Sequence, residues 1–577
     1  MKRLAAALAA LFLVSYVIPL GVPPLTMRDE CRYAEIPREM RASGEWAVPR
    51  LNGLRYFEKP PLGYWLTALS IAALGENNFA VRFPAALSAA ATVLAVLLLV
   101  RRFGGGAVPA AVAAAVLLTS GIFDLFGGYN VLDLPLTLFL TAGLALFFCA
   151  YQAAAARKRT LCLAGFGACC GAAFLTKGFI ALAVPCVVIV PFLAWERQLR
   201  RIVRLAWLPL VLACLVAAPW AILVHLREPD FWRYFFWVEH VQRFTAHKAQ
   251  HAAPWWYFVP VLLVGAFPWT LLAPAAAAGL GRQSTREPLT RFALCWLVFP
   301  FLFFSASHGK LETYILPCFP ALAILVGLGL VRYFAGGGRR LFAWGAGGLA
   351  ALLVAGAIVL AILEVGRSRY APYGPGERVE WAFTTAALLA FAVLAVLAVW
   401  RREPRARLIL IVAGAGVLLA AEDFLPAALF EEAHAPEHFF LRNAPRVARD
   451  GPLCASSATV NAVCWYYKRS DVYLVENSGE LHYGLTFADA RHRDLRGVEL
   501  VGLFGNCRSD RLCTIVLDHA SFAHVREYLG PPEFQDTTPS LVFAQYRGGL
   551  DRIPDGGREA PNAESTPTDR LKDRMAP

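Results

Sequence analysis

The run AVRFPAALSAAATVLAVLLLV at residues 80–100 is long and apolar enough to cross a lipid bilayer as one helix. The hydrocarbon core of a bilayer takes about 20 helical residues. Seven further runs have the same character, at 178–194, 205–224, 255–278, 313–333, 341–363, 379–400 and 408–424. Shorter apolar runs also fit, and they raise the expected number of membrane helices to about thirteen; they lie at 4–22, 107–123, 128–150, 161–175 and 291–306.

The composition agrees with a polytopic membrane protein. Of the 577 residues, 58% are hydrophobic and only 17% are charged, which excludes an ordinary soluble enzyme. A net charge of +13 would suit a nucleic-acid-binding protein, but the positions of the charges indicate a membrane topology instead. We therefore expect membrane lipids as partners, and no nucleic acid.

Clusters of Lys and Arg mark one side of the membrane. When the apolar runs are numbered in order, every cluster falls on the same side, which the positive-inside rule makes cytoplasmic. The clusters are Lys2–Arg3, Arg101–Arg102, Arg157–Arg159, Arg197–Arg204, Arg282–Arg291, Arg339–Arg340 and Arg401–Arg407. The N-terminus is then inside, and thirteen spans leave the C-terminus outside, in the periplasm of a bacterial inner-membrane protein.

Two long outside loops interrupt the membrane domain, which we place at residues 1–425. The first loop, 23–79, contains two amphipathic segments, 33–42 and 62–75, predicted to be helices along the membrane surface. The second loop spans about residues 225–254. Both loops are too long and too rich in aromatic and charged residues to be simple connectors.

The chain changes character after the last apolar run. Residues 426–550 carry more charge and short alternating runs, which predict a small periplasmic α/β domain. The expected strands are VELVGLF (498–504), CTIVLD (513–518) and SLVFAQY (540–546). Residues 551–577 are rich in Pro, Asp, Arg and Gly, which predicts a disordered tail.

Four of the thirteen cysteines, Cys454, Cys464, Cys507 and Cys513, fall in this exported region. An even number in an oxidising compartment permits disulfides, and CRSDRLC at 507–513 is a plausible pair. The sequence has no paired CxxC motif of the kind that binds a structural metal.

Ionisable residues gather at the outside ends of the helices. Because burying a charge at membrane depth is costly, such residues indicate a functional site. The set comes from separate loops, which a compact bundle would bring together; it comprises Asp29, Glu30, Glu58, Lys59, Asp133, Lys177, His240, Arg243, His308 and Lys310.

Structural roles remain open for several of these residues. Asp29 and Glu30 begin RDECRYAEIPREM (28–40), where a capping box before a surface helix is an equally good interpretation. Asp133 stands at the start of a span with Pro135 behind it, so it could cap that helix. Lys177, in a very short turn, could reach the interface by snorkelling.

The second outside loop has the properties of a site for a lipid-linked phosphate. In REPDFWRYFFWVEHVQRFTAHKAQHAAPWWY (227–257), helical spacing places His240, Arg243 and His247 on one face beside a group of aromatics. Apolar walls suit a lipid chain, and a cation suits its phosphate head. SHGKLETYILP (307–317) adds Tyr314 from another turn.

A pre-activated donor fits this arrangement. No GxGxxG, Walker A, HExxH or GxSxG motif occurs in a suitable context, so we expect no nucleotide cofactor. Nucleotides are not available outside the cell to drive the reaction. A sugar carried on a polyprenyl phosphate would arrive through the membrane already activated.

Several motifs together resemble those of the 4-amino-4-deoxy-L-arabinose lipid A transferases, a family of the GT-C superfamily related to protein O-mannosyltransferases. The motifs are RDECRYAEIPREM, GLRYFEKPPLGYW, TKGFIALAVP, REPDFWRYFFWVEHVQRF with AQHAAPWWY, and GKLETYILPCF. The likeness covers about residues 1–330 and fades in the C-terminal region. It implies a GT-C fold and transfer of aminoarabinose from undecaprenyl phosphate to a lipid A phosphate, which protects against polymyxin and other cationic peptides.

The resemblance also suggests roles for individual residues. Asp29 and Asp133 resemble the essential acidic residues of the family, and Glu58 is a third predicted catalytic residue. Glu58 with His240 resembles a pair that binds a divalent metal, zinc or a similar ion. The predicted carrier-phosphate ligands are Tyr56, Lys59, Arg243 and Tyr314, and the additional site candidates are Glu30, Lys177 and Lys310.

Other functions remain as alternatives. A GT-C transferase that moves another polyprenyl-linked sugar to protein or glycan shares the Asp-Glu motif, although the long match at 227–257 argues against it. A transporter or flippase would have ionisable residues near the midplane and repeated halves. A receptor or scaffold would not require the carboxylates. We expect a monomeric enzyme.

Overall fold

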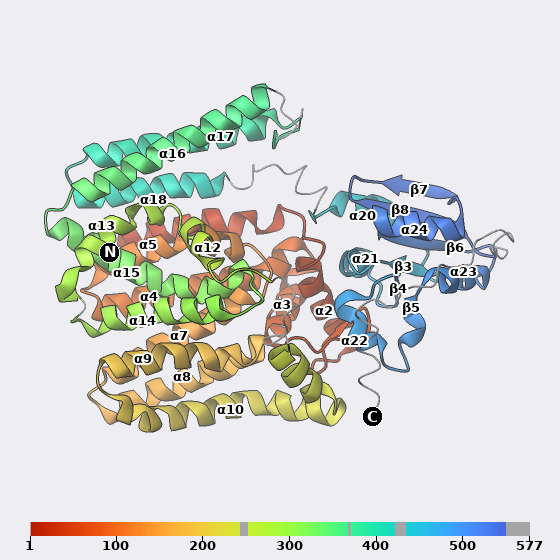
Figure 1. Cartoon of the computed structure of the whole chain (residues 1–577), viewed down its shortest axis with the longest axis horizontal. Coiled ribbons are helices and arrows are strands. Elements are labelled where there is room, and N and C mark those ends of the chain that lie inside the picture. The colour runs from red at the N-terminus through yellow and green to blue at the C-terminus, as the bar shows by residue number, and fades with distance from the viewer. Residues whose placement is uncertain are drawn as a thin grey trace.

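The computed structural model describes residues 2–242, 252–284, 286–366, 371–374, 376–421 and 434–549, without the side chains of 2–5, 239–242 and 282–284. A bundle of long helices forms the larger part of the molecule, and a smaller domain built on a sheet lies at one end of it (Figure 1). The expected domain boundary near residue 425 and the expected tail at 551–577 lie outside the described residues.

The bundle contains every apolar run of the sequence as helix. Its N-terminal half has α1 (Lys2–Phe12), continued by turns to Gly21, then α4 (Asn78–Phe103), α5 (Ala107–Leu118), α6 (Gly121–Gly127), α7 (Asp133–Tyr151), α8 (Ala156–Lys177), α9 (Ile180–Trp195) and α10 (Ile202–Arg227). After residue 252 come α12 (Phe258–Gly265), α13 (Trp269–Ser284), α14 (Pro288–Ala306), α15 (Phe319–Ala335), α16 (Arg340–Val365), α17 (Arg378–Trp400) and α18 (Pro404–Ala420).

Not all of these helices are long enough to cross a membrane alone. Within the described residues, eight pass a length and hydropathy test, or up to ten if each bent pair forms one span. The bent pairs are α5 with α6, at 66°, and α12 with α13, at 91°. Helices of 16 or 17 residues, such as α9 and α18, fall short of the roughly 20 that a bilayer takes. The helical membrane fold is confirmed, and thirteen crossings stay a prediction.

The first loop folds into α2 (Glu30–Ser43), a hairpin of β1 (Arg50–Leu51) and β2 (Leu54–Arg55), and α3 (Leu62–Leu74). Both predicted helices are therefore present. Nine residues of α2 are buried against the rest of the protein, Glu30 and Glu35 among them, and its position along the membrane surface stays a prediction. This helix lies between the bundle and the C-terminal domain (Figure 1).

The C-terminal domain has a mixed six-stranded sheet in the order β5-β4-β3-β6-β8-β7. Strands β3 to β6 pair in parallel, whereas β8 is antiparallel to both β6 and β7. Its strands are β3 (Leu453–Ala455), β4 (Tyr473–Val475), β5 (Asp494–Leu495), β6 (Leu512–Asp518), β7 (Phe534–Thr537) and β8 (Leu541–Arg547). Its principal helices are α20 (Glu437–Asn443), α21 (Val460–Tyr467), α22 (His482–Leu485), α23 (Gly497–Gly505) and α24 (His519–Leu529).

Two of the three strands predicted in this domain are confirmed, as β6 and β8. The third, at 498–504, is wrong because the segment forms α23. The Glu499 carboxylate accepts the backbone N–H of Arg496, which stabilises a helix start. Leu500 and Phe504 are buried at the i, i+4 spacing of a helix face, while Val498 is 70% exposed.

The four cysteines of the domain are free thiols in the structure. Cys454, Cys464 and Cys513 are buried in the domain, where a thiol packs as a small apolar group. Cys513 shares a hydrogen bond with Cys507, so these two residues are neighbours. A disulfide between them stays a prediction.

The first loop and the C-terminal domain share one hydrophobic core. Leu25 and Tyr56 from the loop pack in the same cluster as Phe440 and Trp465 from the domain. At the tip of the hairpin, the buried Asn52 side chain donates to the Val472 carbonyl at 2.8 Å and accepts the Val472 N–H at 2.9 Å. The domain is therefore docked on the first loop.

A buried ion pair joins the first loop to the bundle. Glu30 and Arg82 meet through two hydrogen bonds of 2.7 Å, and Glu30 is fully buried. The carboxylate of Glu30 also accepts the backbone N–H groups of Thr26 and Asn130. Arg82 donates its remaining bonds to three backbone carbonyls between residues 20 and 24. The Glu30 carboxylate and the Arg82 guanidinium thus each have hydrogen-bond partners in addition to one another, as a buried charge pair requires.

We predict that Glu30→Gln destabilises the folded chain by about 3–5 kcal/mol, because it leaves the Arg82 guanidinium buried without its counter-charge. The measurement is thermal unfolding of the purified chain in detergent. Replacing both partners by apolar residues should be milder than either single change. Unfolding of Glu30→Gln at the temperature of the unmodified chain would show that the pair contributes little.

Candidate active site

Asp29 lies at the N-cap position of α2, but its side chain makes no capping hydrogen bond. Its carboxylate instead accepts a hydrogen bond of 2.8 Å from Arg32, three residues along the helix. The Asp29 side chain is 53% exposed, while that of Arg32 is 10% exposed. The capping interpretation is therefore wrong for Asp29, whose carboxylate is accessible at the helix start, whereas Glu30 and Thr26 each accept the other's backbone N–H there.

Arg32 connects Asp29 to the C-terminal domain. Its guanidinium also pairs with Glu480, from the turn before α22, and the Tyr56 hydroxyl lies 3.4 Å from the same Glu480 carboxylate. Neither Arg32 nor Glu480 was among the predicted site residues. Arg32 lies in the quoted 28–40 motif, where its i, i+3 spacing to Asp29 is a usable signal. Glu480 lies 448 residues away from Arg32 in a segment without any motif.

The second predicted carboxylate, Asp133, is the first residue of α7 and is buried. Lys177, the last residue of α8, donates to it at 2.6 Å. The Lys177 ammonium also lies 5.2 Å from the centre of the Tyr314 ring. The bundle thus brings together three residues from three segments. Lys177 pairs with a carboxylate and does not extend alone toward a membrane surface.

Tyr33 stands between the two carboxylate clusters. The guanidinium of Arg32 lies 4.7 Å from its ring centre, and the charges of both Asp29 and Asp133 act on its hydroxyl. Burial raises the pKa of Tyr33, as it does the pKa of Tyr56. Both phenols therefore stay protonated near neutral pH and can donate hydrogen bonds to an anion. Sequence reasoning missed Tyr33.

Tyr64 is a further residue that sequence reasoning missed. It stacks on Tyr33, with ring centres 6.0 Å apart, and it is fully buried. Its hydroxyl has no hydrogen-bond partner in the described part of the chain. An unpaired buried donor is costly unless a ligand satisfies it, so Tyr64 also points to a binding site.

Glu58 and Lys59 follow Tyr56 in the loop. Glu58 is buried, and its charge acts on the Tyr56 and Tyr64 hydroxyls. Lys59 is half-buried, and its ammonium donates to the backbone carbonyl of Glu58 at 3.0 Å. Both residues therefore lie beside the Arg32–Glu480 cluster.

Two of the remaining predicted residues, Glu30 and Lys310, are buried. Glu30 belongs to the buried pair with Arg82. Lys310 is also buried, and its ammonium donates to the backbone carbonyls of Ser307 and Ala253. It therefore joins the two loops that carry residues 252–254 and 307–311. Arg243 and the side chain of His240 lie outside the described residues.

The predicted metal ligands are Glu58 and His240. Among the described side chains, no three His, Cys, Asp or Glu residues gather closely enough to hold a metal ion. Glu58 is in place, but the side chain of its predicted partner His240 is not described. No step of the mechanism below depends on a metal.

The clusters combine two kinds of chemistry. The carboxylates of Asp29 and Asp133 suit a cationic group or a developing positive charge. Lys59, Lys177 and the protonated phenols suit a phosphate. Each carboxylate already has a cation beside it, Arg32 at Asp29 and Lys177 at Asp133. Such a site fits transfer of a cationic group between phosphates.

We predict that Arg32 and Glu480 are energetically coupled, because the Arg32 side chain is only 10% exposed and pairs with Glu480, whose side chain is 36% exposed. In a double-mutant cycle with Arg32→Gln and Glu480→Gln, thermal unfolding should give a coupling energy of about 0.5–3 kcal/mol. The control is the surface pair Arg547–Glu533, whose side chains are 64% and 45% exposed, and its coupling should be below about 1 kcal/mol. Strictly additive effects for Arg32 and Glu480 would contradict the contact.

Two family models match the chain. Residues 2–235 match the model of the dolichyl-phosphate-mannose-protein mannosyltransferases. Residues 431–545 match the C-terminal domain of the arabinosyl transferase ArnT. The first match covers the N-terminal half of the bundle with its first loop, and the second covers the domain with the sheet.

A solved structure shares the fold over nearly the whole chain. The crystal structure of ArnT from Cupriavidus metallidurans bound to undecaprenyl phosphate aligns with a TM-score of 0.79 at 24% identity. The alignment covers 94% of this chain and 98% of that one. An archaeal oligosaccharyltransferase from Archaeoglobus fulgidus aligns more loosely, with a TM-score of 0.51 and 13% identity. These likenesses confirm a helical membrane fold of the GT-C type.

Curated relatives show the family. The undecaprenyl phosphate-alpha-4-amino-4-deoxy-L-arabinose arabinosyl transferase of Shewanella sediminis is 39% identical over 85% of this chain and 89% of its own length. The enzyme of that name from Aeromonas salmonicida is 40% identical over 85% of this chain and 90% of its own length. The chain belongs to the family of undecaprenyl phosphate-4-amino-4-deoxy-L-arabinose arabinosyl transferases.

Proposed function

We propose that the protein transfers 4-amino-4-deoxy-L-arabinose from undecaprenyl phosphate to a phosphate of lipid A. The observation that carries this proposal is the pair of carboxylates, Asp29 and Asp133, each held beside a cation at one end of the bundle. The sugar bears a 4-ammonium group, and the donor and acceptor both bear phosphates. A site with carboxylates, cations and protonated phenols complements all three.

The reaction needs little general-base catalysis. A phosphate acceptor is already anionic at neutral pH, whereas a Ser or Thr hydroxyl would have to lose a proton. An acceptor phosphate oxygen attacks the anomeric carbon, and the bond from that carbon to the carrier phosphate breaks. The carrier phosphate leaves with the electron pair, and attack from the opposite face inverts the anomeric centre.

The site residues divide these tasks. Asp29 and Asp133 orient the sugar through its ammonium group and stabilise the oxocarbenium-like charge of the transition state. Lys59 and Arg243 stabilise the leaving carrier phosphate, together with the hydroxyls of Tyr56 and Tyr314.

The orientation in the membrane is also part of the proposal. Asp133 and Lys177 lie at one end of α7 and α8, whereas Arg157 begins α8 at the other end. Arg101 and Arg102 likewise end α4, the helix that begins near Arg82 and the first loop. The positive-inside rule then puts the site and the C-terminal domain in the periplasm.

Modified lipid A carries less negative charge, which weakens the binding of polymyxin. We further propose that the enzyme acts as a monomer.

We predict that Asp29→Asn and Asp133→Asn each lower transfer by about 100-fold or more, because each removes charge stabilisation at the transition state. The readout is mass spectrometry of lipid A from cells that express each variant, together with polymyxin resistance. Glu533→Gln, on the surface of the C-terminal domain, is the control and should keep activity.

Retained modification in both Asp variants, with normal membrane insertion, would overturn the assigned roles. The match of residues 2–235 to mannosyltransferases supports one alternative, a different polyprenyl-linked sugar with a protein or glycan acceptor. In that case lipid A would never gain a mass equal to a pentosamine.

A divalent cation held by Glu58 and His240 is a separate proposal. It predicts that dialysis of the purified enzyme against a chelator lowers transfer and that Zn²⁺ restores it. Unchanged transfer after removal of all bound metal would contradict this proposal and leave the main one intact.

A further inference from the structure

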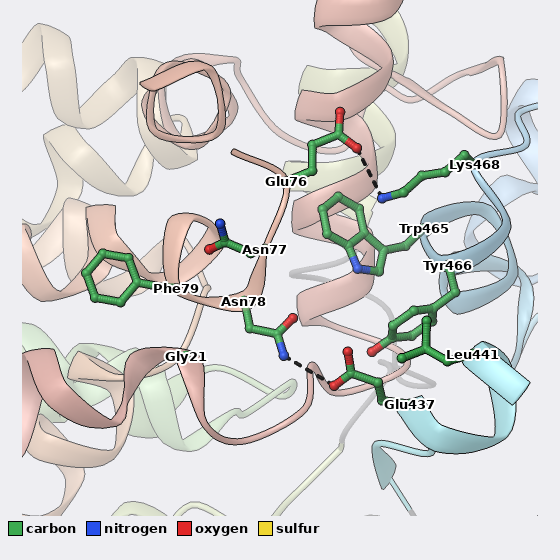
Figure 2. Close-up of a pocket in the computed structure, with 10 residues that line it drawn as sticks. All are labelled: Gly21, Glu76, Asn77, Asn78, Phe79, Glu437, Leu441, Trp465, Tyr466 and Lys468. Atoms are coloured by element: carbon green, nitrogen blue, oxygen red, sulfur yellow. Dashed lines mark hydrogen bonds and ion pairs between the residues drawn. The ribbon is translucent and has the colours of Figure 1, made fainter. Parts of the chain in front are cut away.

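A cavity of about 490 Å³ lies between the bundle and the C-terminal domain, and none of the predicted site residues lines it. One wall is the segment Glu76–Phe79 before and at the start of α4. The facing wall comes from α20 and α21 of the C-terminal domain (Figure 2). Aromatic, acidic, amide and basic side chains all contribute to the lining.

The cavity lies beside the ends of two apolar helices. Gly21, on its lining, ends the first apolar helix, and Asn78 begins α4, which is long enough to span a membrane. Two apolar helices therefore leave the hydrocarbon core beside the cavity. Ile18 and Val22, on either side of Gly21, are both 68% exposed. A lipid with its acyl chains against this apolar surface can place its headgroup in the cavity.

The positive and negative charges of the cavity lining lie in different places. Glu76 pairs with Lys468 at 3.2 Å and with Arg41 at 3.6 Å, so two cations face one carboxylate on that side of the cavity. Glu437 receives a hydrogen bond of 3.2 Å from the neutral amide of Asn78, and no cation pairs with it in the described part of the chain. An excess of negative charge therefore remains at Glu437. It favours a cationic group and disfavours an anionic headgroup.

Tyr466 adds an unpaired polar group beside Glu437. Its hydroxyl is buried, has no hydrogen-bond partner among the described residues, and points toward the Glu437 carboxylate in Figure 2. Burial, together with the nearby Cys31 and Glu437, raises the pKa of Tyr466, so its hydroxyl stays protonated. The Tyr466 oxygen and the Glu437 carboxylate can both accept hydrogen bonds, and a primary ammonium group has three donors to offer.

A quaternary ammonium fits the cavity less well. Such a group needs open aromatic faces, because it has no N–H donors. The Trp465 ring is the largest aromatic surface of the lining, and the Lys468 ammonium already lies 3.7 Å from its centre. The cavity therefore favours hydrogen bonding over an aromatic cage.

We propose that this cavity binds the headgroup of a zwitterionic phospholipid with a primary ammonium group, such as phosphatidylethanolamine. The ammonium lies on Glu437 and the Tyr466 hydroxyl, the phosphate faces Lys468, and the acyl chains pass Phe79 toward the bilayer. The bound lipid would bridge α4 and α20 and so stabilise the docking of the C-terminal domain. This site is independent of the transfer reaction.

The test is thermal unfolding of the full-length chain in detergent with added short-chain lipids. Dihexanoyl phosphatidylethanolamine should raise the unfolding temperature in a saturable manner. The phosphatidylcholine and phosphatidylglycerol of the same chain length should have little effect. Glu437→Gln should weaken the apparent affinity for the ethanolamine lipid by about tenfold, the result of losing one charge-assisted hydrogen bond.

Tyr466→Phe provides a second, milder variant that keeps the ring and removes only the hydroxyl. It should also weaken the response to the ethanolamine lipid. Glu533→Gln, on the exposed surface of the same domain, is the matched control and should respond like the unmodified chain. Equal stabilisation by all three lipids, or an unchanged response in both cavity variants, would overturn the proposal.

Discussion

The buried pair of Glu30 and Arg82 determines the geometry of the rest of the site. Glu30 binds the backbone of Thr26 and Asn130, while Arg82 binds the carbonyls of the segment that leads out of the first helix. Asp29 is the neighbour of Glu30, and Asp133 follows Asn130 by three residues. One ion pair therefore fixes the positions of both carboxylates proposed for catalysis. A pair so deeply buried is stable only because every partner is satisfied.

The C-terminal domain belongs to the site as much as the bundle does. It shares a hydrophobic core with the first loop, and it contributes Glu480 to the cluster of Arg32 and Tyr56. The same domain forms one wall of the cavity at the membrane surface. Its position relative to α2 thus affects the charge balance around Asp29.

Much of the fold could be predicted from sequence, because long apolar runs have few alternatives to membrane helices. The segment 498–504 was harder to assign, because a short apolar run fits both the periodicity of a helix and that of a strand. Asp29 and Glu30 show a second limit. Adjacent helical residues point in different directions, and only the packing decides that Glu30 turns inward to Arg82 while Asp29 stays accessible. Glu480 could not be found, because its contact with Arg32 depends on how two separate domains dock.

The central claim is that a lipid phosphate attacks the sugar directly while Asp29 and Asp133 hold it. The most direct measurement is the anomeric configuration of the product that the purified enzyme makes from a synthetic undecaprenyl phosphate-aminoarabinose and lipid A. Direct attack predicts a product inverted at the anomeric carbon relative to the donor. A product with retained configuration would exclude attack from the face opposite the carrier phosphate and would contradict the account.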